Sequence, residues 1–325
     1  MKVIVTDKQR SGVALQFAQA IGAIVQGRYF YIPESKGKGY ITGFSWIDNE
    51  LRMMVRNYYL FEEVLLERTN EFAEDQDDII FSLSGIFTSV LGRQKEILVE
   101  RANVLICMQA VSTVLTMPSN TFFKNISIAV SRRYLRELFG HLRHPAVLSI
   151  LEGKENFAFE TVVTPEMIKT GSEIEHMPVP ESLESHYARL KCEELLCYIF
   201  GLLIKREPVP MSSMHISDIK AIYAIKLRLQ TNLDSPPNIA SLAKKAGMSE
   251  PKMRKLFHQT FAKGVFEYYQ SMRMQEAAKL LRENRMGVSE VGYQLGFTNL
   301  SHFSRVFEQH YGIKPKKYSA GLDPL

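Results

Sequence analysis

The sequence predicts an α+β protein in two parts: a β-rich, barrel-like N-terminal domain with flanking helices, and an all-helical C-terminal domain. Short segments rich in β-branched and aromatic residues recur through residues 27–131. Helical periodicity then dominates from about residue 218. Within that helical part, residues 238–261 and 288–312 each carry a pattern typical of a helix-turn-helix unit. The two halves of the chain are therefore expected to have different tasks.

Length and composition fit two folded domains. The 325 residues suffice for two separate cores, and 46% hydrophobic with 23% charged residues is ordinary for a globular protein. No apolar run approaches the ~20 residues of a membrane-spanning helix. The segment 1–7 lacks the apolar core of a signal peptide. We therefore expect a cytoplasmic protein without a membrane segment.

Residues 1–26 include a short amphipathic helix over residues 13–22, and strand patterns follow from residue 27. Turn signals at Gly37, Asp48-Asn49 and Pro118 separate the strand patterns. Many short strands at this spacing favour a barrel or closed sandwich over alternating βαβ units. The expected strands are 28–33, 40–46, 51–58, 64–68, 79–83, 97–99, 104–108, 112–116 and 125–130.

Two helices are expected after the strands, at residues 133–139 and 181–206. The second helix is almost entirely apolar from Leu195 to Ile204, which indicates burial either against the barrel or against a second copy of the chain. Prolines and serines then mark a linker. We assign residues 1–206 to a regulatory or dimerisation domain, 207–217 to the linker, and 218–325 to the DNA-binding domain.

Both helix-turn-helix patterns share one spacing. A small residue stands four places before a glycine, as Ala243 before Gly247 and as Gly292 before Gly296. The small residue lets the next helix cross closely, and the glycine accommodates a turn with positive φ. A polar capping residue follows and begins the next helix. These capping residues are Ser249 and Asn299.

The second helix of each unit has an apolar and a polar side. Met253, Leu256 and Phe257 in the first unit, and Phe303, Val306 and Phe307 in the second, are expected to be buried. We expect Arg254, Lys255 and Arg305 to contact base edges in the major groove, where cationic side chains pair with guanine. Alternatively, these cations contact only phosphates. The outward residues are Lys252, Arg254, Lys255, His258 and Gln259, then Leu300, Ser301, His302, Ser304 and Arg305.

Charge and length support this interpretation. Residues 216–325 contain 17 Lys and Arg against 9 Asp and Glu, whereas residues 1–215 contain 23 and 26. A basic C-terminal third suits a polyanion partner. Residues 265–283 read as one helix of ~27 Å, which can hold two recognition helices roughly one DNA turn, ~34 Å, apart.

A further set of residues runs through both units and the helix between them. It comprises Ile239, Ala240, Ala243, Gly247, Met248, Ser249, Leu256, Phe257, Tyr268, Arg273, Ala277, Gly296, Phe297, His302, Phe303, Arg305, Phe307, Gly312, Pro315 and Tyr318. With these residues, the region from about Ile219 to Ala320 resembles the DNA-binding domain of the AraC/XylS family of bacterial transcription regulators. The resemblance implies seven helices, two helix-turn-helix subdomains and usually an N-terminal domain for effector binding or dimerisation.

The sequence departs from the family pattern in both units. Gly292 stands where the family usually has alanine, and Ala262 stands where it usually has glycine. Gln309 and His310 replace more basic residues, and Glu308 is acidic. We therefore expect a less sharp end to the first recognition helix and weaker DNA contact by the second.

Many members of this family carry a cupin-like barrel, which the strand series resembles in pattern. A metal-dependent cupin needs histidine ligands inside the barrel, yet the first histidine is His141, after the strands. His141 and His144 are expected to form a polar helix end. We expect no metal, no cofactor and no catalytic residue. One set of side chains either lines an effector pocket or faces outward from its strands: Trp46, Arg52, Arg56, Tyr58 and Arg68.

The sequence thus favours a transcription regulator, expected to be a ligand- or signal-responsive activator that binds promoter DNA and contacts RNA polymerase. The expected effector is a small molecule of unknown identity, and a homodimer is a further expectation. A dimeric DNA-binding protein with a purely structural N-terminal domain is the alternative. An alkyl-DNA repair methyltransferase is disfavoured, because Cys107, Cys192 and Cys197 cannot supply four thiolate zinc ligands.

Overall fold

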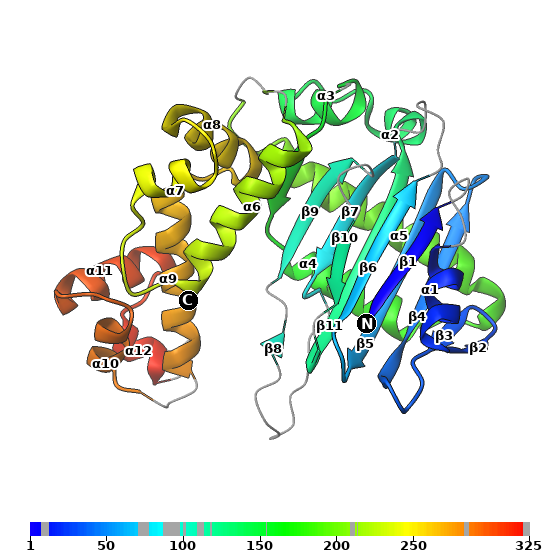
Figure 1. Cartoon of the computed structure of the whole chain (residues 1–325), viewed down its shortest axis with the longest axis horizontal. Coiled ribbons are helices and arrows are strands. Elements are labelled where there is room, and N and C mark those ends of the chain that lie inside the picture. Colours follow the sequence, from blue (N-terminus) through cyan, green and yellow to red (C-terminus); the bar gives the residue numbers. More distant parts are fainter. Residues whose placement is uncertain are drawn as a thin grey trace. The chain divides into compact units, whose positions relative to one another are not determined.

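The computed structural model describes residues 1–7, 13–70, 78–86, 98–99, 102–108, 114–117, 119–153, 155–208, 212, 214–282 and 286–320. The chain divides into two units, Met1–Ser213 and Met214–Leu325 (Figure 1). The N-terminal unit joins strands to helices, and the C-terminal unit is helical throughout its described residues. The predicted α+β class is confirmed at this level.

Two sheets make up the β-structure of the N-terminal unit. The smaller sheet has the order β1-β6-β10, with β1 parallel to β6. The larger follows the order β12-β9-β7-β11-β5-β4-β3-β2 and is antiparallel along this path, while β8 pairs with β11 in parallel. The strands are β1 (Lys2–Asp7), β2 (Ile24–Gln26), β3 (Tyr29–Tyr31), β4 (Gly37–Trp46), β5 (Leu51–Leu60), β6 (Val64–Asn70), β7 (Asp78–Ser84), β8 (Leu98–Val99), β9 (Asn103–Met108), β10 (Val114–Met117), β11 (Thr121–Ser131) and β12 (Ala158–Thr161).

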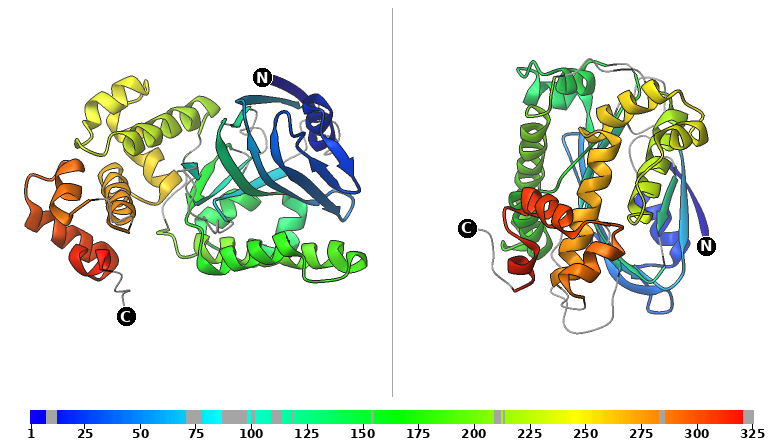
Figure 2. Two further views of the ribbon diagram at one scale, coloured as in Figure 1. Left: turned by 90° about the horizontal axis from the view of Figure 1, so that it is seen from below. Right: turned by 90° about the vertical axis from the view of Figure 1, so that its left-hand side faces the viewer.

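The predicted closed barrel is not confirmed. Strands β2 and β12 end the larger sheet, and the described residues contain no pairing that closes it. Alternation of apolar residues shows that one face of a strand is buried, but it does not specify whether another strand or a helix covers that face. In this unit, helices cover one face of the larger sheet (Figure 2).

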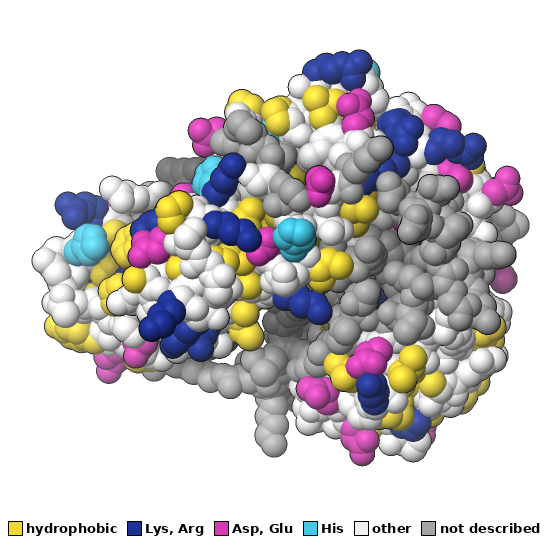
Figure 3. Space-filling model, turned by 45° about the horizontal axis from the view of Figure 1, so that its top comes forward, with side chains coloured by type: hydrophobic (Ala, Val, Ile, Leu, Met, Phe, Trp, Pro, Cys, Tyr) yellow, Lys and Arg dark blue, Asp and Glu magenta, His cyan; other side chains and the backbone are white. Residues whose placement is uncertain are grey.

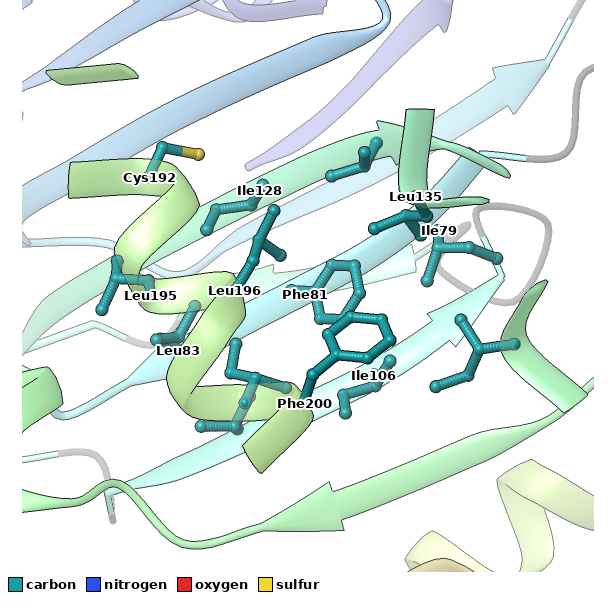
Figure 4. Packing of buried hydrophobic residues seen from close by; sticks show 14 of the residues in the cluster. Ile79, Phe81, Leu83, Ile106, Ile128, Leu135, Cys192, Leu195, Leu196 and Phe200 are labelled. Carbon is teal, nitrogen blue, oxygen red and sulfur yellow. The ribbon is translucent and has the colours of Figure 1, made fainter. Parts of the chain in front are cut away.

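The helix-covered face holds the larger core. Helix α5 (Glu181–Leu203) lies across strands β7, β9 and β11, and its Phe200 points toward Phe81 (Figure 4). Leu195 and Leu196 of α5 and Ile106 of β9 belong to the same cluster. These side chains are at most 1% exposed, so this half of α5 is core. Three further helices contribute to the same cluster. They are α2 (Arg132–Phe139), α3 (Pro145–Leu151) and α4 (Pro165–His176).

A second apolar cluster lies on the opposite side of the larger sheet. Strand β5 shows the division, because Met53 and Val55 join the helix-covered cluster whereas Tyr58 and Leu60 join this second one. The smaller sheet and Phe17 of α1 (Val13–Ile21) complete it. Successive residues of a strand point to opposite faces, so one strand can serve two cores.

The C-terminal unit contains seven helices in its described residues, as the family resemblance implied. Apolar residues of four of these helices form one core cluster, which includes Met274, Val291, Phe303 and Tyr318. The helices are α6 (Ile216–Thr231), α7 (Ile239–Lys245), α8 (Glu250–Phe261), α9 (Val265–Arg282), α10 (Val288–Gln294), α11 (Leu300–Tyr311) and α12 (Pro315–Ser319).

Candidate DNA-binding interface

Helices α7 and α8 form the first helix-turn-helix. The Ser241 backbone N–H donates to the Asn238 side chain at 2.9 Å, which begins α7. Gly247 takes φ +65° in the turn. The Lys252 backbone N–H then donates to the Ser249 hydroxyl at 3.4 Å, which begins α8. The predicted order of helix, glycine turn and capped helix is confirmed here.

Helix α8 has the buried and exposed sides expected of a recognition helix. Met253, Leu256 and Phe257 are at most 2% exposed, as predicted. Lys252, Arg254 and Lys255 are exposed, and His258 is half-buried. The prediction that Gln259 faces outward is wrong, because this side chain is only 4% exposed. Gln259 follows Leu256 by three residues and therefore lies at the edge of the apolar stripe.

An ion pair restrains one of the predicted DNA contacts. The Lys252 ammonium lies 2.9 Å from the carboxylate of Asp218 on α6. Burial acts to raise the pKa of Asp218, but hydrogen bonds from Lys252 and from the His215 backbone N–H outweigh it and hold the pKa below its ordinary value. The role of Asp218 was not predicted. Its position three residues after the residue that caps α6 was the available signal.

Helices α10 and α11 form the second helix-turn-helix with a closer crossing. A Cβ atom added to Gly292 would lie 2.7 Å from Leu300 Cδ2 and 3.2 Å from Phe303 Cδ1. Gly296 takes φ +75° in the turn. The His302 backbone N–H donates to the Asn299 side chain at 3.0 Å and begins α11. The glycine at 292 therefore matches the bulk of Leu300.

Helix α11 exposes fewer lysine and arginine side chains than α8. Ser301, His302 and Arg305 are exposed, and Ser304 is half-buried. Phe303 and Phe307 are fully buried, as predicted, and Val306 packs against the same core. The prediction that Leu300 faces outward is wrong, because α10 crosses α11 at Gly292 and leaves the leucine half-buried.

Helix α9 joins the two subdomains and anchors the second one. Nε and Nη2 of Arg273 donate to the Leu295 carbonyl oxygen at 3.0 and 2.5 Å. The guanidinium also stacks on Phe297, 3.7 Å from the ring centroid. Because Arg273 is 6% exposed, these contacts fix the second turn on the linker helix within the core. The sequence pattern contained Arg273 and Phe297 but did not predict that they touch.

The surface of the C-terminal unit carries many cations. Lys, Arg and His side chains are spread over the face visible in Figure 3.

In the part of the chain that the structure describes, no cluster of three or more His, Cys, Asp or Glu side chains could hold a metal ion. None of the helices described is both long and apolar enough to span a bilayer.

Several side chains of the N-terminal unit that were candidates for an effector pocket make contacts with other residues of the same unit. Arg52 pairs with Asp78, and Trp46 Nε1 donates to Ser185 at 3.0 Å. Arg56 donates to Asn125 at 2.8 Å and to Ser127 at 2.7 Å; Tyr58 is buried and stacks on Phe123. The side chain of Arg68 lies outside the described residues.

Two capped helix-turn-helix units on one linker helix give the C-terminal unit the arrangement that is typical of DNA-binding domains. Residues 242–321 match a family model described as a helix-turn-helix domain. The chain is 33% identical over 141 residues to the arabinose operon regulatory protein of Escherichia coli K12, and 30% identical over 141 residues to that of Salmonella typhimurium LT2. The resemblance to the AraC/XylS family is thereby confirmed for this domain.

These alignments cover part of each protein. They span 43% of this chain and about half of each arabinose regulator, 47% and 49%. The crystal structure of ToxT from Vibrio cholerae O395 aligns with 85% of this chain and 99% of that protein, at 14% identity and a TM-score of 0.32.

Proposed function

We propose that the chain is a sequence-specific DNA-binding transcription regulator that places α8 and α11 in successive major grooves of one duplex. The observation that carries this proposal is the pair of capped helices with exposed polar sides, joined by α9. Its 18 residues span about 27 Å, near the ~34 Å of one DNA turn. A single chain would then contact two grooves without a partner.

The polar sides of α8 and α11 divide into two roles. Arg254, Lys255 and Arg305 are exposed on these helices, so we assign them to base edges. Exposed Lys252, together with half-buried His258, suits phosphate contact, and the ion pair with Asp218 would hold Lys252 at the flank of α8. The other proposed contacts are Ser249, Asn299, Ser301, His302 and Ser304, of which Ser249 and Asn299 also cap their helices.

The N-terminal unit is proposed to make the regulator responsive to a signal or small molecule, and to supply a dimer contact. Activation through RNA polymerase and a cytoplasmic location belong to the same proposal. The support is the division into two units, one of which is an AraC-type domain. A screen of small molecules by thermal shift on the full chain, followed by DNA affinity with and without each hit, tests the response.

A purely structural N-terminal unit is the second candidate. The observation that favours it is the presence of apolar clusters on both sides of the larger sheet. Under this candidate no ligand changes DNA affinity. The methyltransferase alternative loses support, because Cys107 and Cys192 are buried and burial raises the pKa of the Cys192 thiol well above its ordinary value.

The decisive experiment compares Arg305→Ala with Lys316→Ala. Lys316 is an exposed cation on α12 that lies outside both recognition helices. A site is first selected from random duplexes, and binding is measured by fluorescence anisotropy against a scrambled duplex. Arg305→Ala should cost about 1–3 kcal/mol on the selected site and much less on the scrambled one. Lys316→Ala should lower the affinity for the selected site and for the scrambled duplex equally. Equal losses for Arg305→Ala would remove this residue from base recognition, and absence of any selected site would refute the function.

A further inference from the structure

Lys263 occupies the connection between the first recognition helix and the linker helix. Helix α8 ends on Ala262 with φ +52°, and α9 begins at Val265. The Lys263 ammonium donates a hydrogen bond to the Ser271 hydroxyl of α9 at 2.9 Å. Ser271 is 6% exposed and Lys263 is half-buried, so the lysine side chain lies along α9 rather than extending into solvent.

This ammonium has no counter-charge among the residues that the structure describes. Within those ranges, the Ser271 hydroxyl is its hydrogen-bond partner and no carboxylate forms an ion pair with it. Lys252 of the same subdomain, by contrast, pairs with Asp218. Removal of water from a charge costs free energy that a neutral hydroxyl offsets only in part. The site can therefore gain stability from an anion.

The corresponding position of the second subdomain holds an apolar residue. Both recognition helices end on a left-handed residue, Ala262 in α8 and Gly312 in α11. The residue that follows is Lys263 in the first subdomain and Ile313 in the second. Ile313 packs against the core cluster of its own subdomain. An apolar side chain is thus compatible with this helix end, so the geometry of the helix end does not explain the lysine.

Helix α11 reaches the same point from the second subdomain. Partial burial of the imidazole and, after it, the charge of Lys263 lower the pKa of His310, so the two side chains lie near each other. His310 is the last residue but one of α11, and enough of it is exposed for a ligand to reach it. A flexible cation and a ring nitrogen therefore lie between the C-terminal ends of the two recognition helices.

We propose that Lys263 and His310 bind one phosphate of the DNA backbone, in the stretch of duplex between the major grooves that α8 and α11 occupy. The inference rests on the proposed function, which supplies the duplex. The C-terminal end of a recognition helix contacts the backbone in homeodomains, and an ammonium beside an imidazole offers N–H donors to phosphate oxygens. Such a contact reads no base; it fixes the position of the duplex against both subdomains.

A purely structural role for Lys263 is the alternative. A cation near the C-terminus of a helix interacts favourably with the partial negative charge there, and Lys263 follows the end of α8. This role stabilises the folded protein, but it does not respond to a change made in the DNA. The two roles therefore differ in any measurement that alters the DNA alone.

Neutral phosphates in the DNA test the contact directly. Single methylphosphonates are placed one at a time between the two contacted grooves of the selected site, and affinity is measured by fluorescence anisotropy. At one position the wild type should lose about tenfold in affinity, because a charge-assisted hydrogen bond is removed. Lys263→Met should bind the unmodified duplex about tenfold more weakly and lose nothing further at that position.

Matched variants provide the controls, and thermal unfolding shows that each is folded. Lys279→Met removes an exposed lysine of α9 and should keep the full methylphosphonate loss at that position. Lys263→Arg should keep most of it, because the charge remains, and His310→Ala should reduce it. Lys263→Met should also lower the slope of log affinity against log salt by about one.

The result that overturns the inference is an equal methylphosphonate loss for the wild type and Lys263→Met at every position. Stabilisation of the DNA-free wild type alone by inorganic phosphate, against chloride at matched ionic strength, would then assign the site to a free anion. Absence of any selected site would refute the proposed function and this contact with it. Equal losses on a selected site refute this contact alone.

Discussion

The two helix-turn-helix subdomains share a spacing but place different small residues at the helix crossing and at the end of the recognition helix. The first uses Ala243 at the helix crossing and ends its recognition helix on Ala262, which takes φ +52°. The second uses Gly292 at the crossing and ends on Gly312 with φ +74°. Both helix crossings thus require a small residue, and the size of the neighbouring side chains decides whether that residue can be alanine or must be glycine. Leu300 occupies the space that a methyl group at position 292 would need.

The recognition helices also differ in charge. Helix α8 carries Lys252, Arg254 and Lys255 with one carboxylate, Glu250, whereas α11 carries one cation, Arg305, with one carboxylate, Glu308. Burial, together with the charge of Lys263, lowers the pKa of His310, so this residue adds little positive charge at neutral pH. The first subdomain is therefore expected to supply more of the salt-dependent affinity.

Replacement of the two turn glycines should give the largest difference in the free energy of unfolding. Gly296→Ala puts a Cβ atom 1.7 Å from the Asp234 carbonyl oxygen at φ +75°, and should cost about 3 kcal/mol or more. Gly247→Ala meets no atom within 4 Å at φ +65° and should cost only about 1 kcal/mol. Urea denaturation of both variants measures the difference. Equal losses would mean that backbone conformation, rather than close approach, sets the need for glycine.

Arg273 should matter more to the second subdomain than to the first. Arg273→Met removes two hydrogen bonds to Leu295 and the stacking on Phe297, at a cost of about 2–3 kcal/mol. Hydrogen exchange should show loss of protection concentrated in α10 and α11. Arg273→Lys should be intermediate, because it keeps the charge but lacks the planar fork that points two nitrogen donors at the Leu295 carbonyl. Uniform loss of protection across both subdomains would contradict the anchoring role.

The residues that end the recognition helices should respond in opposite directions. Ala262→Gly relieves a left-handed conformation and should stabilise the unit by about 0.5–1 kcal/mol. Gly312→Ala introduces that strain in the second subdomain and should destabilise by a similar amount. Thermal unfolding of the two variants provides the comparison. The expected symmetry fails if both substitutions shift the melting temperature in the same direction.

The Asp218–Lys252 pair should give the smallest effect. The pKa of Asp218 is lowered in the folded protein, so its stabilisation is present above the ordinary aspartate pKa and is lost as pH falls through the folded value. Lys252 is about half exposed, which limits the contribution to below about 1 kcal/mol. Stability curves of Asp218→Asn and wild type should therefore converge once the pH has fallen below the folded-state pKa of Asp218. A constant gap at all pH values would exclude the ion pair as the cause.

The sequence predicted the periodic features of this structure well. Helix periodicity located α5 and α9, and capping residues located the starts of α8 and α11. Each of the nine predicted strand segments has a counterpart, although residue 97 and residues 112–113 lie outside the described residues. These features depend on local pattern, which a single sequence contains.

Features that depend on distant neighbours were missed. The short strands β2 and β12 have too few residues for a recognisable period, and strand alternation could not decide between a barrel and a helix-covered sheet. In the candidate interface, Gln259 and Leu300 were misplaced because each lies at the edge of an apolar stripe. There the crossing helix, rather than the period, decides exposure.

The contact at Gly296 has a consequence for how the C-terminal unit could be divided. Asp234, whose carbonyl approaches Gly296, belongs to the segment between α6 and α7, ahead of the first helix-turn-helix. The neighbouring Leu233 packs against the core cluster that includes Met274 and Phe303, and its carbonyl accepts a hydrogen bond from the Tyr269 hydroxyl. The two halves are thus interleaved along the chain. A fragment that contained only the second helix-turn-helix subdomain would lack the contacts made by residues 233 and 234. A fragment intended to fold on its own must therefore begin upstream of residue 233.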